Sequence, residues 1–515
     1  MVDVVGSRTL NDLLDEREAS DGQRTACTIE ALSGERVELT YAELASTTRR
    51  LAGGFSRAGI GKGDAVLVHL PNCVELVLSW FALARCGAVM VPSNPLLTVR
   101  EIAYAATKAE VVAAVTRPDH QAAIRQAVPG LADDKVFVTG TTFPALLEGD
   151  EFSGASVQDT DVVEMIFTSG TTAAPKGVLL THANCLRSGE QVAKSLYLTP
   201  DDCCLSALPA FHVNAQSSTI LPALSVGARF VLLESYRASQ YLHKLAEHAA
   251  TVTSLVGTQV RTLLRQPVSP ADRAHHVRHV FYAINVLDAE YREFERRFGM
   301  KLLNGYGLSE AMTAVTIAPI FGNDGWPSVG LPLIDREVRI VGADGNEAST
   351  GEIGEITVRG VPGRSIMKGY FKDEAATRAA LRDGWLYTGD SGYVDEKGYV
   401  YFVDRKKDMI KRSGENVSAS EIEAVLLEHP GVAEAAVIGV PDEVRDEAIV
   451  AYVVARDGEV LTAGEILEFC SSRLASFKLP SRVELPASLP KTSIGKIEKK
   501  ALRAEAGQRL ESAGR

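Results

Sequence analysis

The chain has 515 residues, of which 54 are Lys or Arg and 66 are Asp or Glu, so its formal net charge is −12. This acidic balance disfavours nucleic acid as the main partner, because binding a duplex requires a concentrated basic face. With 46% hydrophobic and 23% charged residues, the composition excludes a disordered or fibrous protein and is typical of a globular one. The length fits about two to four domains, or one large α/β body with a smaller companion.

Cysteine usage and the N-terminal residues indicate where the protein works. The seven cysteines are scattered without a C-x-x-C spacing, which predicts neither a disulfide framework nor a zinc site and favours a reducing compartment. The first residues carry acidic side chains where a signal peptide would be basic. The most apolar region, 74–91, is interrupted by Glu75, Arg85 and Gly87, and falls short of the roughly 20 apolar residues of a membrane span. We therefore expect a cytoplasmic protein.

Up to about residue 330, helical and strand patterns alternate along the chain. Amphipathic, alanine-rich segments predict helices at 41–58, 73–85, 99–107 and 183–196. Short β-branched runs predict strands at 65–70, 88–92, 111–116, 228–233 and 278–282. This alternation predicts an α/β body with a largely parallel sheet.

The pattern changes in the last third of the chain. Short strands separated by glycine turns are expected at 337–341, 354–358 and 399–403, and they predict a small antiparallel sheet or barrel. A charged segment at 404–408 comes next. Beyond it we expect helices at 419–429 and 463–474 and strands at 435–440 and 449–455, which together can form a separate α+β domain. We therefore place the N-terminal domain at 1–404 and the C-terminal domain at 405–515.

The run from Ile166 to Val178 reads IFTSGTTAAPKGV and is the most informative of the chain. Its small residues let backbone N–H groups approach phosphate oxygens, its hydroxyl groups add donors, and Lys176 supplies a positive charge. The spacing lacks the G-x-x-x-x-G-K-[ST] pattern, which excludes a P-loop NTPase. Taken alone, the run predicts a phosphate site about as well as it predicts an ordinary polar surface loop.

Five further motifs follow this loop in order. They are YGLSE at 306–310, GWLYTGD at 384–390, DR at 404–405, KRSGEN at 411–416 and PKTSIGK at 490–496. Together with the loop they resemble the adenylate-forming superfamily, which contains acyl-CoA ligases, carrier-protein adenylation domains and firefly luciferase. The resemblance covers nearly the whole chain. Within the superfamily, the runs AFHVN at 210–214, DRKKDMI at 404–410 and RDE at 445–447 are most similar to medium-chain and carnitine or crotonobetaine-type CoA ligases.

The resemblance implies a fold and a two-step reaction. It implies a large N-terminal domain of parallel-rich α/β subdomains with a small β-barrel, and a small mobile α+β C-terminal domain with its hinge near Lys407. A carboxylate attacks the α-phosphate of ATP and releases pyrophosphate, and the thiol of coenzyme A then attacks the acyl-adenylate and releases AMP. No general base is needed for the first step, because a carboxyl group of pKa about 4.3 is already ionised at neutral pH. Cations and oriented donors must instead neutralise the phosphoryl oxygens.

The resemblance also assigns roles by position. The residues it implies for ATP or AMP are Thr168, Ser169, Gly170, Thr171, Thr172, Ala283, Tyr306, Gly307, Ser309, Glu310, Asp390 and Arg405. Glu310 is also the implied Mg²⁺ ligand, and Asp390 the acceptor for the ribose hydroxyls.

The catalytic and acyl-binding positions follow in the same way. The implied catalytic set is Lys496, Lys176, His212 and Gly414, with Lys496 bridging the carboxylate and the α-phosphate and the segment around Gly414 replacing it after the domain rotates. Acyl binding is implied for His212, Gly257, Asn304 and Gly305, although His212 fits a hydrogen-bonded core histidine equally well. These acyl positions are mostly small or polar, which is compatible with a bulky or functionalised acyl group.

Three positions depart from the superfamily pattern. Ala173 stands where most members have glycine, and Ile284 and Val286 stand in a run that is usually small beside the adenine. All three departures concern adenylation, so one alternative is a ligase that only forms the thioester, using an adenylate made by a companion enzyme. A second alternative is a carrier-protein acyl-adenylating enzyme or a non-catalytic nucleotide-binding member. The chain contains no carrier domain, so we expect CoA as acceptor, and the oligomeric state stays open, with a homodimer as one option.

Overall fold

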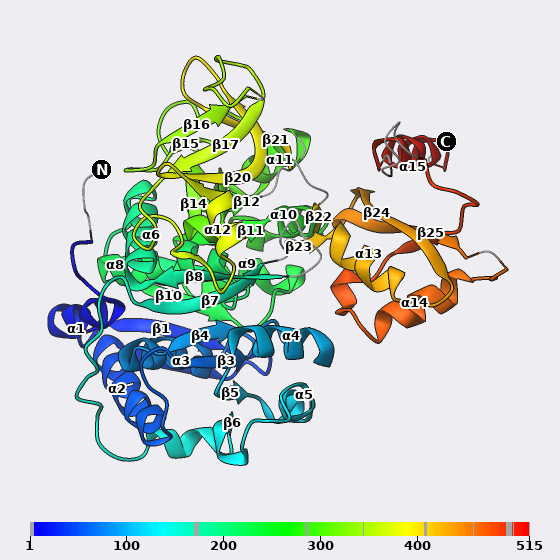
Figure 1. Cartoon of the computed structure of the whole chain (residues 1–515). Helices are drawn as coiled ribbons and strands as arrows, with labels where there is room; N and C mark the ends of the chain where they lie inside the picture. The colour runs from blue at the N-terminus through cyan, green and yellow to red at the C-terminus, as the bar shows by residue number, and fades with distance from the viewer. Residues whose placement is uncertain are drawn as a thin grey trace. The chain divides into compact units, whose positions relative to one another are not determined.

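The computed structural model describes residues 5–168, 175–283, 286, 288–342, 344–405, 409–456, 458–490, 497 and 499–513 (Figure 1). The chain divides into two compact units. The larger comprises Met1–Pro95, Ala106–Phe167 and Gly177–Asp404, and the smaller comprises mainly Arg405–Arg515, together with 96–105 and 168–176.

The larger unit contains a nine-stranded sheet with a parallel centre. Its order is β15-β14-β13-β12-β11-β9-β10-β1-β2. The strands from β13 across to β1 are parallel, and β2, β14 and β15 are antiparallel to their neighbours. The bounds are β1 Thr25–Glu30, β2 Arg36–Thr40, β9 Cys203–Ser206, β10 Arg229–Leu233, β11 Val252–Val256, β12 His279–Ala283, β13 Lys301–Leu308, β14 Thr313–Ile317 and β15 Leu331–Pro332.

A second sheet of seven strands has the order β18-β8-β7-β4-β3-β5-β6. Its bounds are β3 Ala65–His69, β4 Val89–Pro92, β5 Ala113–Thr116, β6 Val136–Val138, β7 Val162–Thr168, β8 Lys176–Thr181 and β18 Gly369–Tyr370. Strands β3, β4 and β5 are buried at every residue. This explains why their sequences are continuous apolar runs rather than alternating ones, since a parallel sheet is covered on both faces.

Helices cover these sheets. Their bounds are α1 Leu10–Asp21, α2 Tyr41–Arg57, α3 Val74–Cys86, α4 Val99–Ala109, α5 Gln121–Ala127, α6 His182–Ser195, α7 Val213–Ala215, α8 Leu221–Val226, α9 Ala238–Glu247, α10 Gly257–Leu264, α11 Asp288–Phe298 and α12 Glu374–Ala380. Figure 1 shows α2 beside α3 and α6 beside α8, and both pairs are in contact. The closeness of α6 and α8 depends on Gly189, where an added Cβ would lie 2.6 Å from the Ser225 hydroxyl and 2.8 Å from the Leu221 carbonyl oxygen.

The last part of the larger unit is a five-stranded sheet, in the order β16-β17-β20-β19 with β21 paired to β20. The bounds are β16 Val338–Val341, β17 Gly354–Arg359, β19 Leu381–Arg382, β20 Trp385–Val394 and β21 Val400–Arg405. The pairings of β17 with β16 and β20, and of β19 with β20, are antiparallel, as the glycine-punctuated pattern predicts.

The smaller unit is an α+β domain with helices on both faces of one sheet. Its bounds are β22 Met409–Arg412, β23 Glu415–Ser418, α13 Ala419–Leu427, β24 Val432–Asp442, β25 Asp446–Ala455, α14 Ala463–Ser471, β26 Arg482–Glu484 and α15 Lys499–Ala513. Successive side chains of β24 alternate between two apolar clusters, as a period of two requires. Ala435 and Val437 pack with residues of α13 and α14, whereas Ala436 and Ile438 pack with Leu502 of α15.

The observed elements confirm the predicted fold class of a parallel-rich α/β body, a small antiparallel sheet and an α+β C-terminal part. Several elements were not predicted, among them strands β1, β2 and β8, so Lys176 opens a strand before α6 begins. Among the described residues, no helix is both long and apolar enough to cross a membrane.

Candidate functional site

Four of the candidate acyl and nucleotide residues lie at one edge of the nine-stranded sheet. Gly257 directly follows β11, Ala283 ends β12, and Asn304 and Gly305 lie on β13. The register pairs Val256 with Ala283, and Tyr282 with Asn304, so these positions are neighbours at the carboxyl ends of three parallel strands. Ligands of open parallel sheets bind at such edges. The structure thus brings together residues that lie about 50 positions apart in the sequence.

Asp390 is buried and joined to Tyr306 by a hydrogen bond. The Tyr306 hydroxyl donates to Asp390 Oδ2 at 2.8 Å, and Asp390 has 4% of its surface exposed. The backbone N–H of Asp390 donates to the Thr388 hydroxyl at 3.1 Å. The intervening Gly389 has φ +74°, a conformation that glycine adopts without strain. Two motifs that the sequence separates by 84 residues therefore form one polar site.

Ser309 and Glu310 lie on a short 3₁₀ turn, Ser309–Ala311, immediately after β13. Glu310 Oε1 accepts a hydrogen bond from the Tyr370 hydroxyl at 2.8 Å, and the Glu310 carbonyl accepts from the Met367 N–H at 2.7 Å. Burial, together with the negative charge of Glu310, raises the pKa of Tyr370. Tyr370 therefore remains a donor and holds a hard carboxylate oxygen, the ligand type that Mg²⁺ prefers, in a fixed place.

His212 follows the carboxyl end of β9 and directly precedes α7. It is half-buried and its ring lies 5.3 Å from that of Phe211, centroid to centroid. Since β9 pairs with β11 in parallel, this segment leaves the same sheet edge as Gly257. The backbone of α7 continues into a π-helical turn, Gln216–Ile220, which the sequence analysis did not anticipate.

Two acyl candidates also have packing roles. Asn304 is buried and donates to the Ser328 carbonyl at 2.9 Å. A Cβ at Gly305 would lie 2.5 Å from the Phe281 ring and 3.1 Å from the Thr316 carbonyl oxygen. The packing of the sheet therefore requires glycine at position 305, whether or not a ligand binds beside it.

The phosphate-loop candidates are described only at their ends. Thr168 ends β7 and Lys176 begins β8, and both are half-buried. The candidates Ser169, Gly170, Thr171 and Thr172, with the departure Ala173, lie outside the described residues. Thr181 caps the N-terminus of the following helix, α6, because its hydroxyl accepts a hydrogen bond from the Asn184 N–H at 3.2 Å.

The remaining candidates lie further along the chain. Gly307 is the penultimate residue of β13, and Arg405 ends β21. Gly414 connects β22 and β23 with φ +87°. Val286 is 6% exposed and packs in the apolar cluster that contains Tyr282, so the core accommodates its bulk. The candidates Lys496, Lys407 and Ile284 lie outside the described residues.

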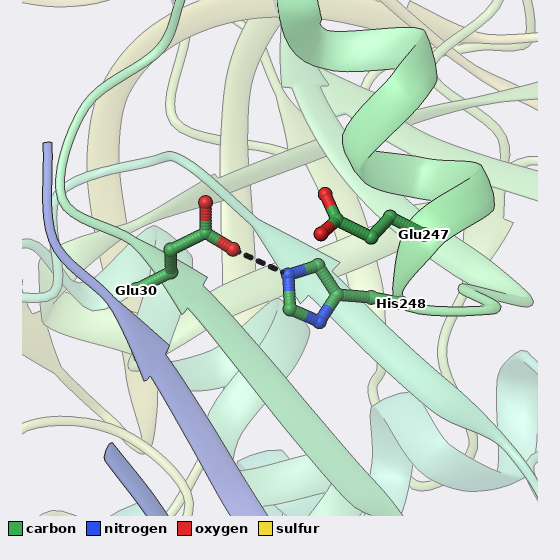
Figure 2. A group of neighbouring side chains, drawn as sticks. All are labelled: Glu30, Glu247 and His248. Atoms are coloured by element: carbon green, nitrogen blue, oxygen red, sulfur yellow. Dashed lines mark hydrogen bonds and ion pairs between the residues drawn. The ribbon is translucent and has the colours of Figure 1, made fainter. Parts of the chain in front are cut away.

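A second cluster of titratable groups, Glu30, Glu247 and His248, is shown in Figure 2. His248 Nε2 lies 2.7 Å from Glu30 Oε2, and burial lowers the pKa of the imidazole. Two cationic side chains already form ion pairs with both carboxylates. Lys244 Nζ lies 2.6 Å from Glu30 and 2.8 Å from Glu247, and Arg36 pairs with the same two residues. A metal ion would have to displace these cations, so we interpret the cluster as a structural ion-pair network.

Comparison with known proteins identifies the family. The family model described as AMP-binding enzyme matches residues 14–371, and the model described as AMP-binding enzyme C-terminal domain matches residues 421–496. The chain belongs to the AMP-binding enzyme family. Its match to a crotonobetaine/carnitine–CoA ligase from Salmonella enteritidis PT4 is 38% identical over 517 residues and covers 98% of this chain and 100% of the relative.

Solved structures agree with this membership. A double mutant of o-succinylbenzoate CoA synthetase from Bacillus subtilis, bound to a product analogue, has a TM-score of 0.86 at 29% identity, covering 97% of this chain and 99% of that one. The same enzyme in complex with AMP has a TM-score of 0.69 at 29% identity, covering 95% and 97%. These findings confirm the predicted resemblance and the predicted activity. The protein is an AMP-forming acid–thiol ligase, an acyl-CoA synthetase that uses ATP and CoA, and the comparisons do not favour either alternative.

Proposed function

We propose that this ligase binds the adenylate at the carboxyl edge of the nine-stranded sheet, and that 1–404 and 405–515 act as a binding domain and a mobile domain that serve the two half-reactions in turn. The observation that carries the proposal is the hydrogen bond between Tyr306 and Asp390 beside Ser309 and Glu310. It supports the proposal because Tyr306, three residues before Ser309, bonds a buried carboxylate of the kind that suits a ribose diol, while Ser309 and Glu310 offer a hydroxyl and a carboxylate for the phosphates and their cation.

In the nucleotide site, Asp390 would accept hydrogen bonds from the two ribose hydroxyls, while Tyr306 fixes the rotation of its carboxylate. Ser309 would donate to the α-phosphate, and the remaining phosphates would lie against the loop that runs from Thr168 to Lys176. Glu310, oriented by Tyr370, would hold Mg²⁺. When bound, the ion supplies positive charge to the phosphate oxygens.

On the acyl side, we propose that the acid lies near His212, Gly257, Asn304 and Gly305. The curated relative acts on crotonobetaine and carnitine, and the solved neighbour acts on o-succinylbenzoate. All three acids carry a polar or charged group at a distance from the reacting carboxylate. Together with the small and polar candidate residues, this favours a functionalised acid over a plain fatty acid as substrate.

The test is acid-dependent exchange of labelled pyrophosphate into ATP, followed by AMP release when CoA is added. The panel contains crotonobetaine, carnitine, o-succinylbenzoate and medium-chain fatty acids, each paired with its synthetic adenylate. We expect strong exchange with at least one functionalised acid and thioester formation from its adenylate. Thioester formation from adenylates without exchange for any acid would contradict the adenylation half of the proposal and restore the companion-enzyme alternative. Exchange confined to fatty acids would contradict the proposed substrate class.

A further inference from the structure

Glu164 is a carboxylic acid in the interior of the seven-stranded sheet. It lies on β7, opposite Met90 of β4, and its side chain is fully buried. No ion pair joins Glu164 to any residue in the described part of the chain. Its carboxyl group is bonded by Gln216, whose Nε2 donates to Glu164 Oε1 at 2.6 Å. A carboxylate buried without a cation is strongly disfavoured relative to the neutral acid.

Burial accordingly raises the pKa of Glu164 to about 8, and the hydrogen bond from Gln216 lowers it only in part. In the described part of the chain, Cys185 on α6 is an ionisable group that interacts with Glu164, and burial raises the pKa of that thiol as well. At neutral pH both groups are therefore protonated. Because Oε1 of Glu164 accepts from Gln216, we assign the proton to Oε2, which has no hydrogen-bond partner among the described atoms.

Gln216 connects this buried acid to the segment that carries His212. Its Nε2 also donates to the Ala210 carbonyl at 3.0 Å, so both amide hydrogens are used. The Ala210 N–H in turn donates to Asn72 Oδ1 at 2.7 Å, and Asn72 Nδ2 donates to the carbonyls of Leu208 and Leu233, both at 2.9 Å. Both main-chain groups of Ala210, two residues before His212, are therefore held by buried side-chain amides.

A π-helical turn begins at the residue that donates to both acceptors. It begins at Gln216, and Pro222 follows the turn as the second residue of α8. Proline has no N–H for the Ser218 carbonyl, and its ring would clash with that carbonyl in a regular helix. The wider turn relieves this conflict, and such turns occur frequently at functional sites.

We propose that Glu164 is a positioning residue for the acyl half of the reaction: as a neutral acid it fixes Gln216, which fixes the Ala210 carbonyl and so the placement of His212. The inference rests on the proposed assignment of His212 to the acyl site. It concerns a residue that does not touch the substrate, and it predicts a specific effect on the acid and not on the nucleotide.

The experiment compares Glu164→Gln, which keeps the carbonyl acceptor in a neutral side chain, with Glu164→Met, which removes it. We expect Glu164→Gln to stay within about twofold of wild type at neutral pH. Glu164→Met should raise the KM for the acid roughly three- to tenfold, as expected for one lost buried hydrogen bond, with the KM for ATP unchanged. Gln216→Leu breaks the same link from the other side and serves if Glu164→Met does not fold. Met165→Leu, on the adjacent buried position, is the matched control.

The pH profile separates positioning from packing. Ionised Glu164 still accepts the hydrogen bond from Gln216, so kcat/KM for the acid should keep its value as pH rises through about 8. The charge without a cation should instead cost stability, so wild type should lose stability relative to Glu164→Gln as pH rises toward about 8. Cys185→Ala should behave as wild type does, because that thiol remains protonated in this range.

Three results would overturn the proposal. An unchanged acid KM in both Glu164→Met and Gln216→Leu, with only a lower melting temperature, would show a purely structural role. An equal rise in the KM for the acid and the KM for ATP in Glu164→Met would show a general loss of structure and no specific positioning of the acyl side. If wild type shows no acid-dependent exchange at all, the proposed function fails together with this inference, whereas normal wild-type exchange limits the failure to Glu164.

Discussion

Asp390 is held by a side chain from another sheet and by its own turn. The Tyr306 hydroxyl comes from the nine-stranded sheet, while Gly389 and Thr388 belong to the five-stranded sheet. In the proposed role, Asp390 accepts hydrogen bonds from two hydroxyls at once. Binding is then stronger if its carboxylate is already held in place, because the entropy of ordering it is lost before the ligand binds.

Removal of the Tyr306 hydroxyl tests whether the fixed position of Asp390 contributes to nucleotide binding. Tyr306→Phe should raise the KM for ATP roughly three- to tenfold, the cost of one buried hydrogen bond to a charged group, and leave the KM for the acid nearly unchanged. Steady-state kinetics with each substrate varied in turn would measure both values. Tyr393→Phe is the control, because the Tyr393 ring stacks on Tyr401 within the five-stranded sheet. A larger effect on the acid than on ATP would show that Tyr306 belongs to the acyl side.

The site was only partly predictable at this scale. Tyr306, Glu310 and Asp390 stand in motifs, so resemblance finds them. Tyr370 and Gln216 do not, because their roles arise from contacts across 60 and 52 residues that no local pattern encodes. Glu164 did leave a signal, an acidic residue inside the apolar run Val162–Thr168, and a buried charge in such a run marks a position worth attention.

At the scale of elements, the contact between α6 and α8 shows how one residue sets a spacing. Gly189 has no room for a Cβ, since a carbonyl oxygen and a hydroxyl of α8 lie within 3 Å of that position. A backbone carbonyl cannot move aside as a flexible side chain can. The methyl group of an alanine at position 189 must therefore push the two helices apart.

Gly189→Ala is therefore expected to destabilise the protein by about 1–3 kcal/mol, even though alanine is the better helix former. Gly464→Ala in α14 is the matched control, because nothing lies within 4 Å of its added Cβ. That variant should be neutral or stabilising by up to about 1 kcal/mol. Thermal denaturation of both proteins would measure the difference. Equal stabilisation by both substitutions would contradict the tight packing at Gly189.

Elements were predictable where a pattern was strong and isolated. The helix predicted at 41–58 is observed at Tyr41–Arg57, since its capping Thr40 and its apolar spacing agree. Strand β8 was missed because Lys176 and Gly177 open it and a helix was expected soon afterwards. The π-helical turn follows from Pro222, but a proline in that position also fits an ordinary helix start, so the sequence alone could not decide between them.

At the scale of the whole molecule, two family models match the two parts of the chain, 14–371 and 421–496. The proposal that the mobile domain presents different residues to the two half-reactions makes a separable prediction. The residue that serves the first step should be dispensable for the second, because an adenylate supplied from outside bypasses it.

Lys496→Ala should reduce acid-dependent pyrophosphate exchange roughly a hundredfold or more, as expected when a cation that stabilises a phosphoryl transition state is lost. Thioester formation from the synthetic adenylate and CoA should remain within a few fold of wild type. Lys397→Ala, an exposed lysine of the larger unit, is the control for loss of charge alone. Parallel loss of both half-reactions would contradict the separation.

The π-helical turn also has a consequence for how such ligases diversify. A π turn contains one residue more than a regular helical turn, so deletion of one residue between Ala215 and Pro222 would let the helix close and would rotate the preceding segment by about 100°. Gln216 would then no longer reach Glu164, and the Ala210 carbonyl before the helix would lose the hydrogen bond from Gln216. If His212 borders the acyl group as proposed, a change of length at this one place would alter the choice of acid without altering any strand.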